Sequence, residues 1–398
     1  MRFLTAGESH GPGLVVIAEG LPRGVPVSAE MLDHELRRRR AGYGRGPRAK
    51  SEPEEIEILA GLRGGRTTGA PVSVLLRHRH WPTWRPVLDP WIPMTEGREL
   101  EGAGPDLAGV RTAPTRPRPG HADLAGAYKY GLRDLRDVIE RASARETAAR
   151  TVAGTLAKAF LLPLGVAIKS HVSRIGPCLA GLLPRTLEEF SRADASPVRT
   201  LDPESTAAMM SAIDTAAANG DTLGGTFDVA AFGIPAGLGS YGQWDQRLDG
   251  KLAQAVMSIP GVKGVEIGEG FALAALRGSE AHDAILPDPP RGTRRPANRA
   301  GGIEGGLSNG ETILVRAAVK PVPTLAKPLP SVDLATGLAA EAAVERSDVC
   351  VVPAAAVVGE AMVAWVLAGA FLDKFGGDTL DEVARAFASY GDRQPWHA

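Results

Sequence analysis

The sequence is poor in cysteine, with only Cys178 and Cys350 in 398 residues. So few cysteines exclude a disulfide framework and any metal site built from cysteine alone. The longer apolar runs are interrupted by glycine, proline or charged residues, and the first eight residues contain no apolar core of a signal peptide. We therefore expect a soluble, cytoplasmic protein without a membrane partner.

The sequence also lacks an excess of basic residues, with 45 Lys and Arg against 46 Asp and Glu. A dedicated nucleic-acid binder usually shows a basic surplus, so we expect no nucleic-acid partner. Aromatic residues are scarce as well, at 5%. One cluster departs from the balance of charge, because six arginines occur between positions 37 and 48. This cluster predicts that the ligand is a local anion.

The segment 141–147 reads RASARET and precedes a run rich in alanine and leucine. Ser143 and Glu146 have the spacing of a capping box, which predicts a helix over 148–162. Acidic residues are usual at this positive end of a helix, but Arg141 and Arg145 lie there instead. Two cations at a helix start favour a bound anion such as phosphate. Two surface arginines paired with distant carboxylates explain these residues equally well.

Two histidines occur in loops that glycine or proline makes tight. His10 lies between Gly7 and Gly11, in a bend that presents side chains to solvent or ligand. His121 follows two prolines, and Asp123 is placed to orient or charge its imidazole. Both histidines suit proton transfer beside an anion. A structural histidine near a strand and a helix-capping loop are the alternative interpretations.

Three further segments carry candidate ligand-binding residues. The range 298–311 contains two glycine pairs, which let the backbone approach a flat or charged ligand closely. The segment 320–324 reads KPVPT and predicts a phosphate clamp. Asp348 follows Arg346 closely and is a usable base or electrostatic partner. The G-x-G-x-x-G match at 237–242 predicts a turn before a helix, since bulky polar residues follow its third glycine.

Periodicity and capping residues predict a mixed α/β or α+β fold in one domain, without internal repeats. Strands are expected at 14–18, 54–59, 72–76, 166–172, 226–232, 262–267, 312–319 and 349–352. Helices are expected at 28–40, 148–162, 203–219, 246–259 and 359–375, with a last helix from about 378 capped by Thr379 and Glu382. The segment 77–84 is expected to be a loop.

The sequence contains no nucleophilic triad and no metal-ligand set, and His78 with His80 lacks a third ligand nearby. It contains instead a surplus of arginine in stiff loops, two histidines in such loops and one candidate aspartate. This combination suits a small polyanionic substrate handled by acid–base chemistry. A further glycine-lined pocket suits a cofactor that also carries a phosphate.

Eight blocks of the sequence together resemble the chorismate synthase family, in the order of that family. They are TAGESHG (5–11), GYGRG (42–46), RPGHAD (118–123), RASARET (141–147), GDTLGG (220–225), GVEIGEGF (264–271), the glycine-rich 301–310 and RSDVC (346–350). Each block alone is a weak signal. Their joint occurrence from the first ten residues to beyond 350 is specific.

The resemblance implies a lyase of the shikimate pathway, which serves aromatic amino acid biosynthesis. The implied reaction is the anti 1,4-elimination of phosphate from 5-enolpyruvylshikimate 3-phosphate to give chorismate, with reduced FMN and without net redox change. NADPH is a candidate reductant of the flavin. The implied fold is one large domain over 1–398 with helices sandwiched between antiparallel sheets, and the implied assembly is a homotetramer. Mobile active-site loops are expected near 40–50, 77–90, 289–300 and 320–332.

The resemblance also assigns roles to individual residues of this chain. His10 matches the histidine near the leaving phosphate, His121 the histidine beside the reduced flavin, and Asp348 the aspartate that helps the flavin take the ring proton. Residues matched to substrate or nucleotide phosphate are Ser9, Arg39 and Arg45. Residues matched to FMN are Arg141, Ala142, Ser143, Pro260, Gly261, Gly305, Lys320, Pro321, Val322, Pro323, Thr324 and Arg346.

Two positions depart from the family pattern. Pro260-Gly261 replaces the family's Asn-Ala or Gln-Ala, so a side-chain contact to the flavin is lost or taken over by the backbone. Pro323 stands where serine is also common, which is a mild change. Two other functions compete with this interpretation: a phosphate-handling flavoenzyme that transfers hydride, and a non-enzymatic binder of RNA or nucleotides through the arginines at 37–48.

Overall fold

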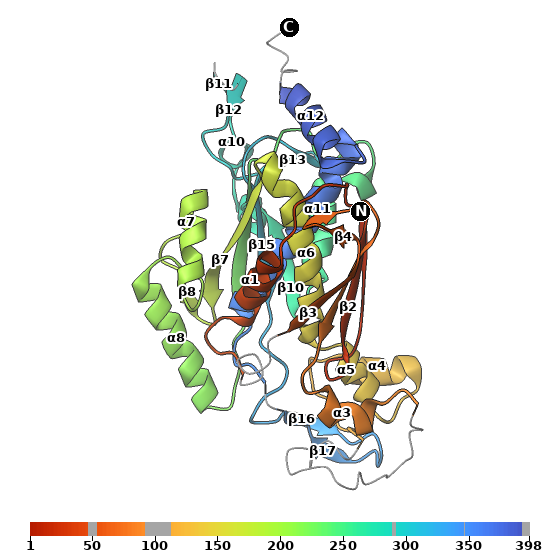
Figure 1. The fold of residues 1–398 in the computed structure, drawn as a ribbon. Helices are drawn as coiled ribbons and strands as arrows, with labels where there is room; N and C mark the ends of the chain where they lie inside the picture. The colour runs from red at the N-terminus through yellow and green to blue at the C-terminus, as the bar shows by residue number, and fades with distance from the viewer. Residues whose placement is uncertain (47–53, 92–112, 289–291, 346, 392–398) are drawn as a thin grey trace.

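A computed structural model of the chain describes residues 1–46, 54–91, 113–288, 292–345 and 347–391. It contains two antiparallel sheets with long helices packed between them (Figure 1). The fold that the family resemblance implies, helices sandwiched between antiparallel sheets, is therefore confirmed, as is the mixture of helix and strand predicted from periodicity.

The first sheet has four strands in the order β1-β2-β6-β3. Their bounds are β1 Arg2–Ala6, β2 Gly13–Glu19, β3 Glu55–Ala60 and β6 Val72–Arg77. Strand β6 shows why this sheet has one buried face, because Val72, Val74 and Leu76 are fully buried while the residues between them are not. Alternate side chains of a strand point to opposite faces, so the buried set faces the helices.

The second sheet has five strands in the order β10-β15-β9-β7-β8. Their bounds are β7 Ala167–Ile175, β8 Cys178–Leu179, β9 Gly225–Phe232, β10 Val262–Ile267 and β15 Ile313–Val319. In β15 the residues Ile313, Val315, Ala317 and Val319 are buried and alternate with partly exposed ones. The second sheet thus also buries one face.

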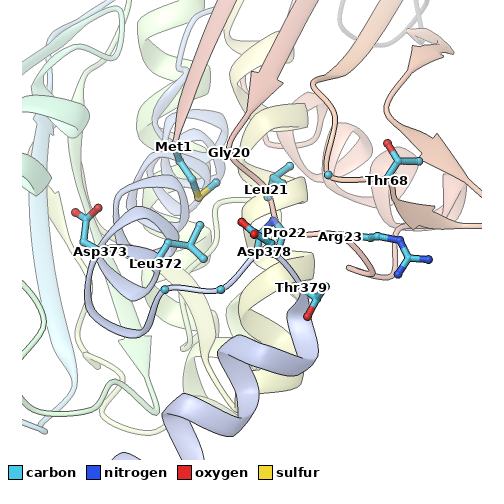
Figure 2. A pocket seen from close by; sticks show the side chains of 13 residues that line it. Met1, Gly20, Leu21, Pro22, Arg23, Thr68, Leu372, Asp373, Asp378 and Thr379 are labelled. Carbon is cyan, nitrogen blue, oxygen red and sulfur yellow. The ribbon is translucent and has the colours of Figure 1, made fainter.

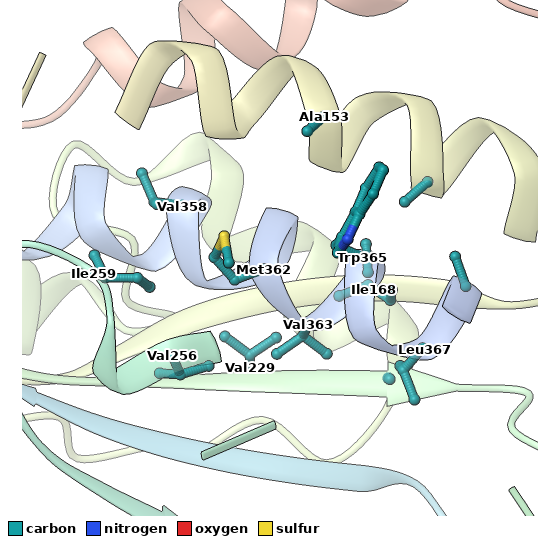
Figure 3. Close-up of a cluster of buried hydrophobic side chains, with 14 of the residues drawn as sticks. Ala153, Ile168, Val229, Val256, Ile259, Val358, Met362, Val363, Trp365 and Leu367 are labelled. Atoms are coloured by element: carbon teal, nitrogen blue, oxygen red, sulfur yellow. The ribbon is translucent and has the colours of Figure 1, made fainter. Parts of the chain in front are cut away.

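Three helices fill the space between the sheets, namely α1 (Ala29–Arg40), α6 (Thr147–Leu161) and α11 (Val352–Phe375). Figure 3 shows Met362 and Val363 of α11 between the second sheet and α6, with Val229 below them. Gly154 of α6 packs so closely on α11 that a Cβ there would lie 2.2 Å from the Cβ of Ala361. The absence of a side chain at this position permits the close packing.

Helix α11 is long and apolar enough to cross a membrane by length and composition, among the described residues. Its most apolar window is 83% buried inside the fold, however. Glu360 lies in the middle of this helix, is fully buried and accepts hydrogen bonds from Arg38, Lys158, Ser170 and Arg199. The helix is therefore explained as the central helix of the core.

The remaining helices lie outside the two sheets or at the ends of the molecule (Figure 1). They are α3 Trp81–Leu88, α4 Asp123–Tyr130, α5 Arg136–Arg141, α7 Leu187–Arg192, α8 Pro203–Ala218, α9 Leu248–Met257, α10 Gly278–Ala281 and α12 Leu380–Gly391. Short hairpins are β4–β5 (Leu62–Arg63, Arg66–Thr67), β11–β12 (Leu286–Asp288, Gly292–Arg294), β13–β14 (Ile303–Glu304, Leu307–Ser308) and β16–β17 (Pro330–Val332, Ala339–Glu341). Helices α3, α4 and α5 and the β16–β17 hairpin gather at one end.

Most expected elements occur, and three expectations are wrong. No strand forms at 349–352, where Cys350 makes a single bridge to Leu223 and α11 begins seven residues earlier than expected. The segment expected as a loop from 77 contains α3 from Trp81. The capping box at the start of α6 does not form, because Glu146 bonds Thr5 and Arg150 instead of the Ser143 amide. The guanidinium of Arg150 is a stronger hydrogen-bond partner for the Glu146 carboxylate than a backbone amide is.

The capping box predicted for the last helix is present. The Thr379 hydroxyl accepts a hydrogen bond from the amide of Glu382 at 3.3 Å, and the Glu382 carboxylate accepts one from the amide of Thr379 at 3.0 Å. The turn at 237–242 is also confirmed, since it leads into the short turn Trp244–Gln246 and then α9.

Candidate functional site

The bend after β1 and helix α5 hold His10 in a defined position. The Nδ1 atom of His10 lies 2.9 Å from Oε1 of Glu140, and the His10 amide donates to Oε2 of the same carboxylate at 2.7 Å. The amide of Ser9 donates to the backbone oxygen of Glu140 at 3.1 Å. The imidazole also stacks on Trp84 of α3, with ring centroids 3.8 Å apart. Its ring plane and its Nδ1 edge are therefore both fixed.

Glu140 is buried, and burial acts to raise its pKa. The hydrogen bonds and charge of His10, together with the charge of Arg136, outweigh burial and hold the pKa of Glu140 below its ordinary value. Arg136 is 3.7 Å from Glu140 and lies over the ring of Trp84. A buried, ionised carboxylate thus faces the imidazole.

The loop before α4 places His121 in a similar environment. Its Nδ1 atom lies 2.5 Å from Oδ1 of Asp123, which is fully buried. Arg118 donates to Asp123 through Nε at 2.8 Å and through its second nitrogen at 3.2 Å. Burial opposes ionisation of Asp123, but the hydrogen bonds from His121 and Arg118 hold its pKa well below its ordinary value. The sequence-based expectation that Asp123 orients His121 is confirmed.

The two histidine–carboxylate pairs lie within electrostatic reach of each other. Burial acts to lower the pKa of Arg118, but the bond to Asp123 and the charges of Asp123, Glu345 and Glu140 raise it. The two pairs are connected by the packing of α4, which begins at Asp123, on α5, which carries Glu140. Helices α4 and α5 are in fact packed together, because a Cβ on Gly126 would lie 2.6 Å from the side chain of Val138.

The start of α6 brings two arginines beside the His10 bend. Arg141 donates to the carbonyl of Thr5 at 3.2 Å, and Arg145 donates to the carbonyl of Ser9 at 3.1 Å. Ser143 caps a short 3₁₀ turn (Ala144–Glu146) by accepting from the amide of Arg145. The bonds of Arg141 in the described part of the chain go to a carbonyl and a hydroxyl, so its positive charge is not neutralised there. This supports the anion interpretation of the segment.

The last turn of α1 and the following loop add Arg39 and Arg45. Arg39 is buried and bonds Thr147 at 3.0 Å and Glu54 at 3.2 Å. Burial and the nearby charges of Arg45 and Arg145 lower the pKa of Arg39 to about 10, against the opposing effect of Glu54. Three guanidinium groups are thus close enough to repel one another, which costs free energy in the absence of an anion.

Asp348 joins this arginine cluster from the other end of the chain. Its Oδ2 lies 3.2 Å from Arg45, and its Oδ1 accepts from the amide of Gly46 at 2.6 Å. The Nε atom of Arg45 is buried and has no hydrogen-bond partner within the described ranges. An orphaned guanidinium nitrogen beside a carboxylate is a donor that a bound anion would satisfy.

The segment 320–324 packs on the loop that carries His121. The Nζ atom of Lys320 donates to the carbonyl of Gly120, and Thr324 accepts from Arg118 at 3.2 Å. Pro260-Gly261 lies beside it, since the Lys320 amide donates to the Gly261 carbonyl at 2.9 Å. The predicted phosphate clamp at 320–324 and Pro260-Gly261, which differs from the family pattern, are therefore neighbours in the fold.

Other members of the predicted flavin set have backbone roles in this neighbourhood. The carbonyl of Val322 accepts from the Thr222 hydroxyl. A Cβ on Gly224 would lie 2.8 Å from the Pro321 nitrogen, and a Cβ on Gly120 would lie 3.5 Å from that of Pro323. Ala142 ends α5 with its amide bonded to the carbonyl of Val138.

Among the described residues that are predicted to bind FMN, Gly305 lies apart from the others. It forms the turn of the β13–β14 hairpin, ahead of β15, whereas Lys320 follows β15. The seven residues of β15 separate the two ends by roughly 20 Å. In Figure 1 the label of β13 accordingly lies at the end opposite α5 and β16. Arg346 lies outside the described residues, so its predicted role is not addressed by the structure.

A cavity among the described residues lies away from this site. It has a volume of about 590 Å³ and lies between the start of the chain, the 20–23 turn and the α11–α12 junction (Figure 2). It is lined by residues such as Met1, Arg23, Asp373 and Thr379, and by no predicted site residue. It carries no histidine and no orphaned buried polar atom. The chemistry therefore points to the His10 and His121 neighbourhood and not to this cavity.

Within the described ranges no group of three or more His, Cys, Asp and Glu side chains could hold a metal ion. His78, one of the two histidines considered for metal binding, bonds the carbonyl of Gly11 through Nδ1 at 2.9 Å. His78 therefore helps to hold the bend that carries His10.

Sequence reasoning missed Glu140, Trp84 and Arg136. Glu140 immediately precedes the RASARET block but is 130 positions from its partner His10, so no local spacing connects them. Trp84 lies in a segment expected to be a loop. A buried carboxylate in a short helix beside two arginines is the signal that could have drawn attention to position 140.

The arrangement combines two imidazoles that are each oriented by a buried carboxylate with a group of arginines. Arg39, Arg141 and Arg145 lie at the start of α6, and Arg45 pairs with Asp348. Such a set can bind a polyanion, stabilise a leaving phosphate and move protons. The donors also fit a phosphate-bearing flavin, because cations and stiff backbone surround the site while the orphaned Arg45 nitrogen lacks an acceptor.

Comparison with known proteins gives a consistent result. The family model for chorismate synthase matches residues 1–372. The chain is 54% identical over 390 residues to the chorismate synthase of Moorella thermoacetica and 52% identical over 393 residues to that of Symbiobacterium thermophilum, with 98% of each chain covered in both cases. A crystal structure of chorismate synthase aligns with a TM-score of 0.77 at 40% identity, covering 98% of this chain and 97% of the other.

Proposed function

Because the chain belongs to the chorismate synthase family, we propose that the two histidine–carboxylate pairs and the arginines around α6 form its active site. The chain is a lyase of the shikimate pathway that eliminates phosphate from 5-enolpyruvylshikimate 3-phosphate to give chorismate. The observation that carries the proposed site is the neighbourhood of His10, His121 and four arginines at one end of the molecule. The cavity in Figure 2 is the competing location.

We assign phosphate binding to Arg39, Arg45 and Arg145. Burial is the main cause of the lowered pKa of Arg39, and the charges of Arg45 and Arg145 lower it further; this repulsion is relieved when a dianion binds among them. The same groups stabilise the charge that accumulates on the phosphate oxygen as the carbon–oxygen bond breaks. Ser9 lies in the same bend and is held by Arg145. It therefore positions its neighbour His10 relative to the bound phosphate.

We assign the proton that accompanies the leaving phosphate to His10. Because Nδ1 of His10 is bonded to Glu140, we assign Nε2 as the atom that donates to the phosphate. The proton lost from the ring is assigned to the side of the site that carries Asp348, whose carboxylate Arg45 holds in place. His121, oriented by Asp123, is placed to stabilise the anionic form of the cofactor. General acid–base assistance of this kind contributes about 10²–10⁴-fold.

The family uses a reduced flavin, and we propose that this chain binds reduced FMN with NADPH as a candidate reductant. A bound reduced flavin would supply electron density transiently to the breaking bond and would recover it, so the reaction would show no net redox change. Arg141, Ala142 and Ser143 on one side and the segments 260–261 and 320–324 on the other would hold it. Arg141 supplies an unneutralised charge for its phosphate, and Lys320 a second one.

We further propose a cytoplasmic homotetramer. Large apolar side chains are exposed around α7, where Leu179, Leu182 and Leu183 are each more than half exposed. Exposed apolar patches of this kind are typical of subunit interfaces.

The test is an anaerobic reaction of the purified protein with chemically reduced FMN and 5-enolpyruvylshikimate 3-phosphate. Phosphate and chorismate should appear in equal amounts while the flavin is still reduced at the end. Net oxidation of the flavin with each turnover would favour the hydride-transferring alternative. A second reaction with oxidised FMN and NADPH in air tests whether the chain reduces its own flavin.

A further inference from the structure

We propose that Glu140 is the positioning residue of His10, which fixes the tautomer and orientation of the imidazole so that Nε2 presents the proton to the leaving phosphate. This inference rests on the proposed acid role of His10. It adds a residue that neither the sequence pattern nor the family resemblance had assigned.

The contacts between Glu140 and the His10 bend are unusually complete. One carboxylate oxygen of Glu140 accepts a hydrogen bond from Nδ1 of His10 at 2.9 Å, and the other accepts one from the His10 amide at 2.7 Å. The backbone oxygen of Glu140 accepts a hydrogen bond from the amide of Ser9 at 3.1 Å. A single residue of α5 therefore fixes two consecutive amides and one ring nitrogen of the bend.

These contacts determine where the imidazole carries its proton. An ionised carboxylate can only accept hydrogen bonds, so Nδ1 of His10 must carry hydrogen. The second nitrogen, Nε2, is then the atom whose proton can be given away. The His10 side chain is 20% exposed, whereas that of Glu140 is fully buried.

Charged groups around His10 differ from those around His121. Asp123 shares its charge with Arg118, which binds it through two nitrogens at 2.8 and 3.2 Å. Glu140 has Arg136 only at 3.7 Å, and Arg118 acts on it at longer range. The negative charge of Glu140 is therefore directed mainly at His10. Opposite charge in direct contact favours the imidazolium form.

The groups that face His10 in the described residues come from three elements. Helix α5 contributes Glu140 and, behind it, Arg136, which also lies over Trp84. Helix α3 contributes the uncharged ring of Trp84. The start of α6 contributes Arg145, whose guanidinium binds the carbonyl of the preceding residue, Ser9. Glu140 is an anion in direct contact with the His10 ring, so its removal should change the protonation of His10.

The experiment compares E140Q, E140D and D137N in the full chain with reduced FMN and substrate. Asp137 lies on the same helix α5, is exposed and has no partner role at the site, so D137N controls for the loss of one carboxylate. Turnover is measured as a function of pH, together with the KM for substrate and the unfolding temperature. H10A is measured in parallel.

We expect E140Q to lower kcat by about 10²–10⁴-fold, as expected for loss of an oriented acid, with KM changed by less than about threefold. A neutral partner no longer favours the imidazolium, so the pH above which the rate falls should move down by at least about one unit. E140D, which keeps the charge, should restore that pH limit towards its original position. D137N should behave as the unaltered chain.

Two results would overturn the inference without touching the proposed site. Normal kcat in E140Q while H10A is inactive would show that His10 needs no positioning by Glu140. A loss of rate in E140Q with an unchanged pH limit and a lowered unfolding temperature would show a structural role only. Normal turnover in H10A would instead remove the proposed acid role of His10, and the role of Glu140 with it.

Discussion

The buried carboxylate of Glu360 offers the sharpest test of how the central helices are held together. It accepts two hydrogen bonds of 2.7 Å from Arg38, one of 2.6 Å from Lys158, one of 2.6 Å from Ser170 and one of 3.2 Å from Arg199. These partners come from α1, α6, the second sheet and the loop before α8. The perturbation we consider is Glu360→Gln, which preserves shape and removes the charge.

The expected magnitude follows from the three cations that the substitution leaves behind. Arg38 retains Glu35 and Asp194 as partners, and Lys158 retains Glu35, so the loss of charge is compensated only in part. Removing one member of a buried ion pair costs about 3–5 kcal/mol. We expect a loss in this range in the free energy of unfolding.

The effect should depend on pH in a definite direction. Burial acts to raise the pKa of Glu360, but the charges of Arg38, Lys158 and Arg199 hold it well below its ordinary value. A carboxyl group whose pKa is lower in the folded state stabilises the protein above its unfolded pKa, about 4.3, and loses that contribution as pH falls through the folded value. The stability difference between E360Q and the unaltered chain should therefore shrink below about pH 4.

The assay is urea unfolding at pH 7 and at several lower pH values, followed by circular dichroism. D373N is the matched control, because Asp373 lies on the same helix, its side chain is 68% exposed and its partner Lys251 is 3.5 Å away. An exposed pair contributes less than about 1 kcal/mol. A loss below about 1 kcal/mol in E360Q, equal to that of D373N, would refute the reasoning.

Three further predictions concern single positions. His121→Ala should lower turnover by about 10²–10⁴-fold with the circular dichroism spectrum retained; near-normal turnover would remove its proposed role. Asp348→Asn keeps an acceptor for the Gly46 amide, so kcat should fall at least about tenfold, as for a lost proton-transfer group, while KM changes little; a change confined to KM would indicate binding alone. Gly154→Ala should destabilise the chain by about 3 kcal/mol in urea unfolding, because a Cβ 2.2 Å from that of Ala361 overpacks the helix contact and outweighs the gain of roughly 1 kcal/mol in helix propensity; equal or higher stability would contradict this.

Much of the fold could be predicted because its local signals agree with its tertiary structure. Helix α1 begins after Ser28, whose side chain accepts from the amide of Met31, and the strands of both sheets follow their apolar alternation. The failures occur where distant groups override local preference. Val349 and Cys350 are apolar enough for a strand, but their amides bond the carbonyl of Gly44, and a helix begins two residues later.

The candidate site likewise contains residues that local sequence signals predict and residues that only the tertiary packing reveals. His10, His121, Asp123 and the arginines could be selected from the sequence because glycine, proline and charge mark their loops. Glu140 could not, since its partner is 130 positions away and only the packing of α5 on the His10 bend brings them together. Family resemblance supplied the flavin residues, and the structure gathers those that it describes at one end of the molecule, apart from Gly305.

The measurement that tests the location of the active site most directly is amide hydrogen exchange with and without reduced FMN and 5-enolpyruvylshikimate 3-phosphate. We predict slower exchange at 9–10, 41–46, 118–123 and 141–146, where the histidine pairs and arginines lie. The residues that line the cavity in Figure 2, at 20–23 and 376–379, should exchange at unchanged rates. Protection at that cavity, with unchanged exchange around His10 and His121, would contradict the account.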